Sequence, residues 1–375
     1  MSVPDSSTPT PTTLASRGEA DPDLRWRRVD TWRTGGLLLV ILVMHVAAFG
    51  ILALLVAPHH YKVGTQVFGL GLGVTAYTLG MRHAFDADHI AAIDNTTRKL
   101  MADGKRPISV GFWFALGHST VVVVLAVLIA AGTREVTSLT SGHSGTHKVL
   151  AVVSTAASGG FLYLIGILNL VALAGIVKVF RGMRAGVFDH DALEAKLDSR
   201  GFLNRILGRL TRSITRPGQM YPVGLLFGVG FDTATEVLLL AMAGSSAAAG
   251  LPWYAIVCLP LLFTAGMSLF DTLDGTFMNF AYHWAFSNPV RKVYYNLAIT
   301  GLSVAVALII GSIELIGVAH DNLGLTGPAT DWIAGLDLGN VGFVIVAAFL
   351  AVWAIAITYW KLARVEQRWN TPSNQ

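Results

Sequence analysis

Two histidines and two aspartates lie close together inside a strongly apolar part of the chain. Residues 82–90 read Arg-His-Ala-Phe-Asp-Ala-Asp-His-Ile, which places His83, Asp86, Asp88 and His89 within seven positions. On a regular helix His83 and Asp86 lie about 60° apart, whereas Asp88 points elsewhere. We therefore expect either that the helix unwinds here or that Asp88 orients one of the histidines.

Further ionisable groups lie in other apolar runs, where each costs about 2.5–3.5 kcal/mol to insert and so marks function by default. Asp232 and Glu236 lie about 40° apart on one helical face, and Asp271 and Asp274 about 60° apart. Two ionised carboxylates side by side in a low dielectric repel each other unless one is protonated or a cation lies between them. The candidate metal ligands are His83, Asp88, His89, Asp86, His118, Asp232, Glu236, Asp271, Asp274 and His45.

Several of these candidates have a structural alternative. Asp232 and Glu236 could form an ion pair with Arg82, and the run from 271 to 275 could be a helix break or a turn. A single histidine on an apolar helix, as at His45, is often only hydrogen-bonded.

The donor types indicate which ions such a site would take. Neutral imidazole with carboxylate suits nickel, cobalt, zinc, iron or copper, whereas calcium or magnesium sites use oxygen donors with little histidine. Cys258 is the only cysteine, which excludes an all-thiolate metal cage and an intramolecular disulfide.

The composition is that of a protein solvated by a bilayer. Hydrophobic residues make up 53% of the 375 positions and charged residues only 13%, against roughly 25% charged in soluble domains. A hydrocarbon core of ~30 Å needs about 20 apolar residues per helix. Eight runs qualify and predict an all-α membrane protein with spans near 35–57, 65–93, 108–132, 149–180, 221–247, 252–280, 293–319 and 341–362.

The basic residues predict how these spans are oriented. With eight spans and a cytoplasmic amino terminus, 23 of the 27 Lys and Arg residues fall in cytoplasmic segments, as the positive-inside rule requires. We expect a multi-pass protein of the inner (plasma) membrane, surrounded by lipid and without a nucleic-acid partner. The predicted parts are a disordered cytoplasmic tail (1–33), spans 1–4 (34–180), a cytoplasmic loop with amphipathic helices (181–220), spans 5–8 (221–362) and a cytoplasmic tail (363–375).

A short internal similarity links the two halves of the chain. Residues 84–86, Ala-Phe-Asp, resemble residues 230–232, Gly-Phe-Asp. Some thirty residues later, 114–119 resemble 263–268. Because spans 2 and 5 are predicted to run in opposite directions, the pattern favours an inverted repeat, which is typical of transporters.

Residues 82–99 closely resemble the signature of the nickel–cobalt transporter (NiCoT) family. The hallmark of that family, a His, four residues and then Asp-His, is matched by His83, Asp88 and His89. Residues 116–119, 230–236 and 262–275 resemble its other three motifs, and the eight-span pattern extends the resemblance over roughly 35–360. The resemblance implies a high-affinity nickel or cobalt permease that is not an enzyme, has no cofactor and takes the ion as its substrate.

Other functions remain open at this level. The spacing of His83 and Asp88 also fits a membrane acyltransferase, although that chemistry leaves the acidic pairs unexplained. A membrane di-iron oxygenase needs ligands from several facing helices, and an exporter of the same ions would use the same residue types. No P-loop motif occurs, so we expect the membrane potential or a proton gradient to drive transport. The nickel-to-cobalt preference, the stoichiometry and the oligomeric state are not determined by these patterns.

Overall fold

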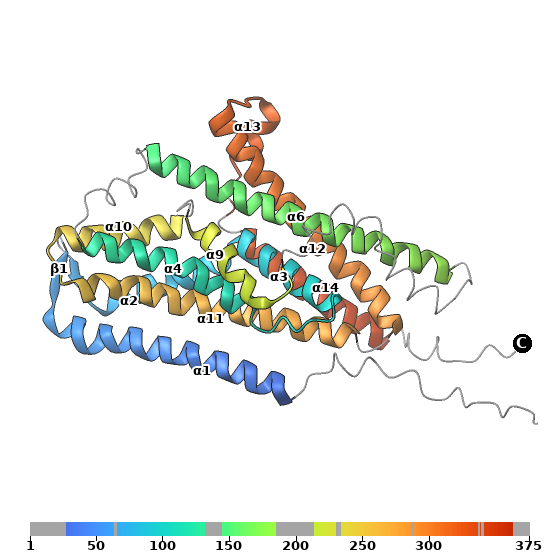
Figure 1. Ribbon diagram of the computed structural model, residues 1–375, viewed down its shortest axis with the longest axis horizontal. Coiled ribbons are helices and arrows are strands. Elements are labelled where there is room, and N and C mark those ends of the chain that lie inside the picture. The colour runs from blue at the N-terminus through green and yellow to red at the C-terminus, as the bar shows by residue number, and fades with distance from the viewer. Residues whose placement is uncertain are drawn as a thin grey trace, which may run out of the picture.

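The computed structural model describes residues 28–63, 66–131, 145–184, 214–229, 234–286, 289–336, 338 and 341–362. Most of these residues form helices that run along the long axis of the molecule (Figure 1). Within the described residues the only strands are β1 (Tyr61–Val63) and β2 (Gln66–Phe68), an antiparallel hairpin in which Tyr61 pairs with Phe68. The prediction of an all-α membrane fold is confirmed.

The helical segments follow one another with short connections. They are α1 (Arg28–Gly50), η2 (Ile51–Val56), η3 (Ala57–His59), α2 (Leu70–His83), α3 (Ala87–Ala102), α4 (Val110–Ala130), α6 (Gly145–Arg184), η4 (Pro217–Gln219), α9 (Met220–Gly228), α10 (Ala234–Ala248), α11 (Trp253–Phe286), α12 (Pro289–Leu323), α13 (Pro328–Ala334) and α14 (Val341–Leu362). The last residues of the predicted 1–33 tail are therefore helical. Residues 1–27, most of the predicted cytoplasmic loop and the tail from 363 lie outside the described residues.

Five helical segments in the described part of the chain are long and apolar enough to cross a membrane. They are Arg28–His59, Val110–Ala130, Lys148–Gly175, Trp253–Ala281 and Leu297–Leu323, which correspond to predicted spans 1, 3, 4, 6 and 7. In α14 the apolar stretch is shorter, Val341–Ile355. Large apolar side chains on α1 such as Leu39, Val46 and Leu54 are exposed, as expected for a surface in contact with lipid tails. The count of eight spans stays a prediction.

Predicted spans 2 and 5 are each built from two helices, which corrects their interpretation as single runs. In span 2, α2 ends at His83 and α3 begins at Ala87, while Asp86 between them has an extended backbone (φ −67°, ψ 144°). In span 5, α9 ends at Gly228 and α10 begins at Ala234. Aspartates are favoured just before and within the first turn of a helix, because free N–H groups and the helix dipole stabilise them there. Asp86 and Asp88 therefore favour a new helix start.

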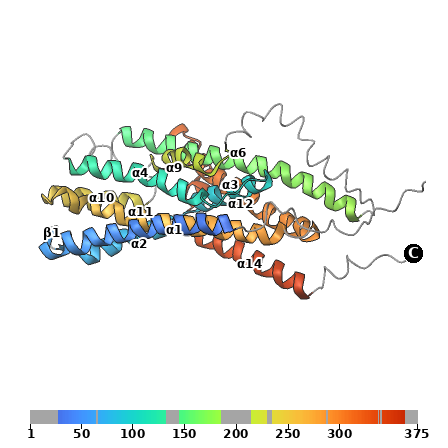
Figure 2. The ribbon, with the colours of Figure 1, turned by 60° about the horizontal axis from the view of Figure 1, so that its bottom comes forward.

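Glycines allow two pairs of helices to pack backbone against backbone. Helix α2 crosses α11, and α9 crosses α4, while the α2–α3 and α9–α10 pairs run in opposite directions along the long axis (Figures 1 and 2). At both crossings an added Cβ would lie 2.0–2.6 Å from a facing carbonyl oxygen: Gly80 against Phe263, Gly266 against Tyr77, Gly224 against Phe114, and Gly117 against Tyr221. Each crossing thus joins a Tyr-x-x-Gly segment to a Phe-x-x-Gly segment. This equivalence supports the predicted inverted repeat.

The buried apolar side chains form two main clusters along the bundle. The α2-side core contains residues of η2, α2, α10 and the first half of α11, including Leu52, Ala76, Leu239 and Leu259. The α3-side core contains residues of α3, α6, α12 and α14, including Ile90, Leu162, Ile310 and Phe349. Helix α4 and helix α11 contribute to both cores, so the helix breaks and the middle of these two helices lie where the cores meet.

Candidate metal centre

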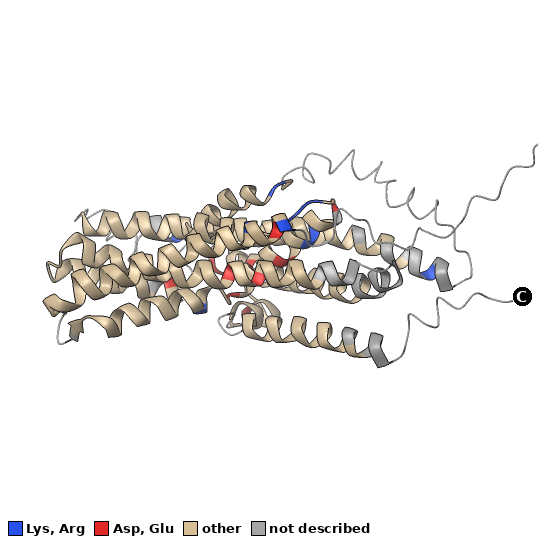
Figure 3. Ribbon diagram, turned by 90° about the horizontal axis from the view of Figure 1, so that it is seen from below, with Lys and Arg blue, Asp and Glu red and all other residues tan. Residues whose placement is uncertain are grey.

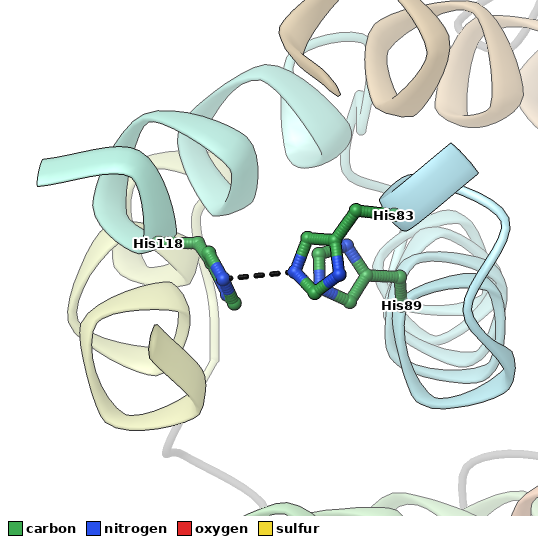
Figure 4. A group of neighbouring side chains, drawn as sticks. All are labelled: His83, His89 and His118. Atoms are coloured by element: carbon green, nitrogen blue, oxygen red, sulfur yellow. Dashed lines mark hydrogen bonds between the residues drawn. The ribbon is translucent and has the colours of Figure 1, made fainter. Parts of the chain in front are cut away.

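Three buried histidines converge at the break in span 2. His83 ends α2, His89 lies in the first turn of α3, and His118 lies in the middle of α4. Their side chains are 1%, 0% and 2% exposed, and one nitrogen from each lies within 4.8 Å of the others. Figure 4 shows the three rings facing one another. This is the only such group of three or more ligand residues in the described part of the chain.

The break in the helix is what brings His83 and His89 together. On a continuous helix, residues six apart lie about 120° apart around the axis and about 9 Å apart along it. Here the chain turns after His83, where the Asp86 amide donates to the His83 carbonyl at 2.9 Å. The two ring centroids are consequently 4.5 Å apart. Of the two alternatives open for this segment, the structure takes the unwound helix.

A carboxylate from the second broken span joins the histidines. Nε2 of His83 lies 2.9 Å from Nε2 of His118, which in turn lies 2.6 Å from Oε1 of Glu236. Glu236 is fully buried in the first turn of α10. Arg82 is exposed, so the contact to the His118 ring replaces the ion pair considered as an alternative for Glu236.

Asp86 and Thr235 hold the other nitrogen of the His83 ring. Oδ2 of Asp86 lies 2.7 Å from Nδ1 of His83, and Oγ1 of Thr235 forms a 3.1 Å hydrogen bond with the same atom. A carboxylate beside Nδ1 favours the tautomer that carries its proton there, which leaves Nε2 free to bind an ion. The orienting role that the sequence assigned to Asp88 is therefore taken by Asp86, while Asp88 accepts the amide of His89 at 2.9 Å.

His89 and Asp271 are the groups whose polar atoms are least satisfied. Oδ2 of Asp271 on α11 lies 3.4 Å from Nδ1 of His89. Both nitrogens of His89 and both carboxylate oxygens of Asp271 are buried without a hydrogen-bond partner among the described residues. Burying such groups is costly unless a hydrogen bond or a cation compensates. A cation between them would satisfy both, so the donor set fits a bound metal ion.

The remaining sequence candidates lie apart from this group. Asp274 lies one turn beyond Asp271 on α11, where its carboxyl interacts electrostatically with Asp94. Both ring nitrogens of His45 are engaged, Nδ1 with the carbonyl of Ile41 at 2.8 Å and Nε2 with the Tyr77 hydroxyl at 3.2 Å. Asp232 lies outside the described residues. The structure thus brings together His83, His89, His118, Glu236 and Asp271, with Asp86 behind His83.

The centre also has residues that the sequence did not single out. Phe114 packs edge-on against His89 with centroids 4.7 Å apart, and Phe263 lies 5.4 Å from His83. These apolar walls keep water out and lower the local dielectric, which strengthens the attraction between a cation and the buried carboxylates. Thr235 and both phenylalanines lie inside the four sequence motifs, so the motifs carried a signal, although residue type alone did not.

Acidic residues are concentrated near the middle of the bundle, between stretches of apolar helix (Figure 3). The centre combines three imidazoles with carboxylates and no thiolate. Borderline-soft divalent ions of the first transition row prefer these donors. Charge and donor type therefore both indicate a site for a divalent transition-metal ion.

A family model described as a high-affinity nickel-transport protein matches residues 69–359, and so includes the broken helices and every residue of the centre. The chain belongs to this family. It is therefore a multi-pass membrane transport protein and not an enzyme, which sets aside the acyltransferase and oxygenase alternatives.

Curated relatives agree over most of their length. The nickel transporter NicT of Mycobacterium tuberculosis is 59% identical over 343 residues, 91% of this chain and 92% of its own. The nickel transporter NixA of Staphylococcus aureus is 41% identical over 333 residues, 89% of this chain and 96% of its own. The cobalt transport protein NhlF of Rhodococcus rhodochrous is 40% identical over 341 residues, 89% of this chain and 94% of its own. No solved structure matches the chain.

Proposed function

We propose that this protein takes up nickel or cobalt ions across the plasma membrane, and that the ion passes through the centre of His83, His89 and His118. The observation that carries the proposal is the pairing of His89 with Asp271, two buried groups without hydrogen-bond partners among the described residues, beside two further imidazoles. The names of the relatives favour nickel or cobalt among the ions that such donors bind.

The proposed binding step exchanges water ligands for protein ligands. His83 and His118 offer Nε2 atoms that already lie 2.9 Å apart, and Glu236 supplies negative charge beside them. Asp271 adds a second carboxylate from the opposite side of His89. Two carboxylates balance the charge of a divalent ion, so the occupied centre would be close to neutral in a low-dielectric surrounding.

The position of the centre is consistent with alternating access. It lies between the α2-side core and the α3-side core, at breaks in both predicted spans of the inverted repeat. Transporters with such repeats bind their substrate at broken helices and rock one part against the other. Movement at the breaks would open the centre first to one side of the membrane and then to the other.

Uptake of radioactive nickel at nanomolar concentration tests the proposal. We expect saturable uptake by cells that express the chain, and background uptake when His118→Ala removes an imidazole from the centre. The matched control is His45→Ala, because His45 lies in a membrane helix but bonds only to Ile41 and Tyr77 in the described structure. Cobalt as competitor ranks the two ions.

Two outcomes contradict the proposal. Wild-type uptake by His118→Ala at equal membrane abundance would remove the histidine centre from the path. Faster loss of nickel from preloaded cells, without uptake, would show export instead.

A further inference from the structure

The unwound segment between α2 and α3 is covered by the start of α14, the helix of the last predicted span. A Cβ added to Gly342 would lie 1.4 Å from the carbonyl oxygen of Phe85 and 3.2 Å from Cδ1 of Ile90. No side chain fits in this space, so only glycine lets the backbone of α14 rest on the break. Phe85 is the residue midway between His83 and Asp86 in the turn.

Aromatic rings hold the same segment from both sides. The ring of Phe85 stacks on Phe343 of α14, with centroids 4.8 Å apart and an interplanar angle of 21°. It also packs against Phe270 of α11 at 5.4 Å, immediately before Asp271 in the chain. Offset and tilted aromatic pairs of this kind stabilise by about 0.5–1.5 kcal/mol beyond their buried area. Phe85 thus ties the break to α14 and to the helix that carries Asp271.

We propose that Gly342 and Phe343 are positioning residues for the ion centre. By holding Phe85, α14 sets the angle between α2 and α3, and with it the separation of the His83 and His89 rings. Helix α14 supplies no ligand, so its effect acts entirely through the break. Metal–nitrogen distances tolerate only about ±0.2 Å, so a small displacement of either ring weakens coordination. This inference rests on the proposed transport function.

The first test compares Gly342→Ala with Gly301→Ala, whose added Cβ on α12 would meet nothing within 4 Å. For Gly342→Ala we expect the KM of nickel uptake to rise about 10-fold or more, as when a residue that orients a ligand is lost. The amount of protein in the membrane and the control variant should stay at wild-type values. In the purified protein we expect the d–d absorption of bound Co²⁺ to shift or weaken, which a change in abundance alone would not produce.

The second test leaves the α14 backbone intact. Phe343→Leu removes the stacked ring and should raise KM several-fold, whereas Phe343→Tyr keeps the ring and should restore it. Phe280→Leu is the matched control, since this residue is 55% exposed on α11. If Gly342→Ala does not reach the membrane, this series decides the question.

Wild-type KM and Co²⁺ absorption in Gly342→Ala, or equal KM values for Phe343→Leu and Phe280→Leu, would overturn the inference. Failure of the proposed function looks different. In that case the wild-type protein itself shows neither metal uptake nor Co²⁺ absorption, whatever the variants do.

Discussion

The three histidines of the centre differ in what holds their rings. His83 is fixed through Nδ1 by Asp86 and Thr235, and its Nε2 faces His118. His118 contacts Glu236 from the other broken span. His89 has no such hydrogen-bonded support among the described residues and faces Asp271. Two imidazoles are thus oriented in advance, while the third can adjust when an ion binds.

This division predicts the effect of removing the charge behind His83. Asp86→Asn keeps the shape of the side chain but no longer favours the proton on Nδ1, so the Nε2 donor is lost in part of the molecules. Loss of an orienting partner typically weakens metal affinity about 10–100-fold. A Co²⁺ titration of the purified protein measures the change.

Asp321→Asn serves as the control, because that carboxylate is 72% exposed at the end of α12. Affinity equal to wild type in Asp86→Asn would show that Asp86 does not orient His83.

At the scale of elements, α3 is anchored by amides as well as by apolar packing. Nδ2 of Asn169 on α6 donates to Oδ1 of Asn95 at 2.8 Å, and Nδ2 of Asn95 donates to the carbonyl of Ser303 on α12 at 3.3 Å. Arg98 donates to the same Asn95 oxygen at 3.3 Å. The half of span 2 that carries His89 is therefore bonded to α6 and α12, which makes α3 part of the α3-side core rather than a free arm.

Removing the α6 contact should cost stability without changing the ion chemistry. Asn169→Ala deletes a buried donor to Asn95, and hydrogen bonds between membrane helices contribute about 0.6 kcal/mol, up to about 1.7. We expect the midpoint of thermal unfolding in detergent to fall by a few degrees while the KM of nickel uptake stays unchanged.

Ser245→Ala is the matched control, because its hydroxyl is exposed and bonds only to the Ala241 carbonyl of its own helix. An unfolding midpoint for Asn169→Ala no lower than that of this control would show that the amide contact adds nothing.

The whole molecule is organised around a seam between two apolar cores, with equivalent glycine crossings on either side of it. The crossing of α2 with α11 belongs to the α2-side core, and α9 crosses α4 near Phe114 and Phe227 of the α3-side core. Because α4 and α11 pass through both cores, they link any movement of one core to the other. The centre lies on this seam, where a change in packing moves its ligands.

At this scale the charge of the ion predicts a dependence on voltage. Two positive charges moving through about 100 mV gain about 4.6 kcal/mol, at roughly 2.3 kcal/mol per charge. That energy supports accumulation on the order of 10³-fold, since each 1.4 kcal/mol is a factor of ten. In vesicles that contain the purified protein, a potassium diffusion potential, negative inside, should therefore drive nickel accumulation.

Collapse of the potential with an ionophore should release the accumulated nickel. Accumulation that follows an imposed pH gradient and ignores the voltage would assign the driving force to protons instead.

The sequence by itself determined the solvent of this protein, the chemistry of its ligands and its family. Length of apolar runs and the scarcity of charge follow from the bilayer and need no tertiary information. His83, Asp88, His89 and His118 were recognisable because ionisable groups are costly in hydrocarbon.

Only the tertiary structure decided which candidates meet. Helical periodicity assumes an unbroken helix, so it could not place His83 beside His89 across the turn at 84–86, nor give the orienting role to Asp86. Contacts between helices far apart in the chain depend on close backbone packing, which no local pattern encodes. These contacts brought Glu236 and Asp271 to the histidines, left His45 with Tyr77, and placed Gly342 on the carbonyl of Phe85.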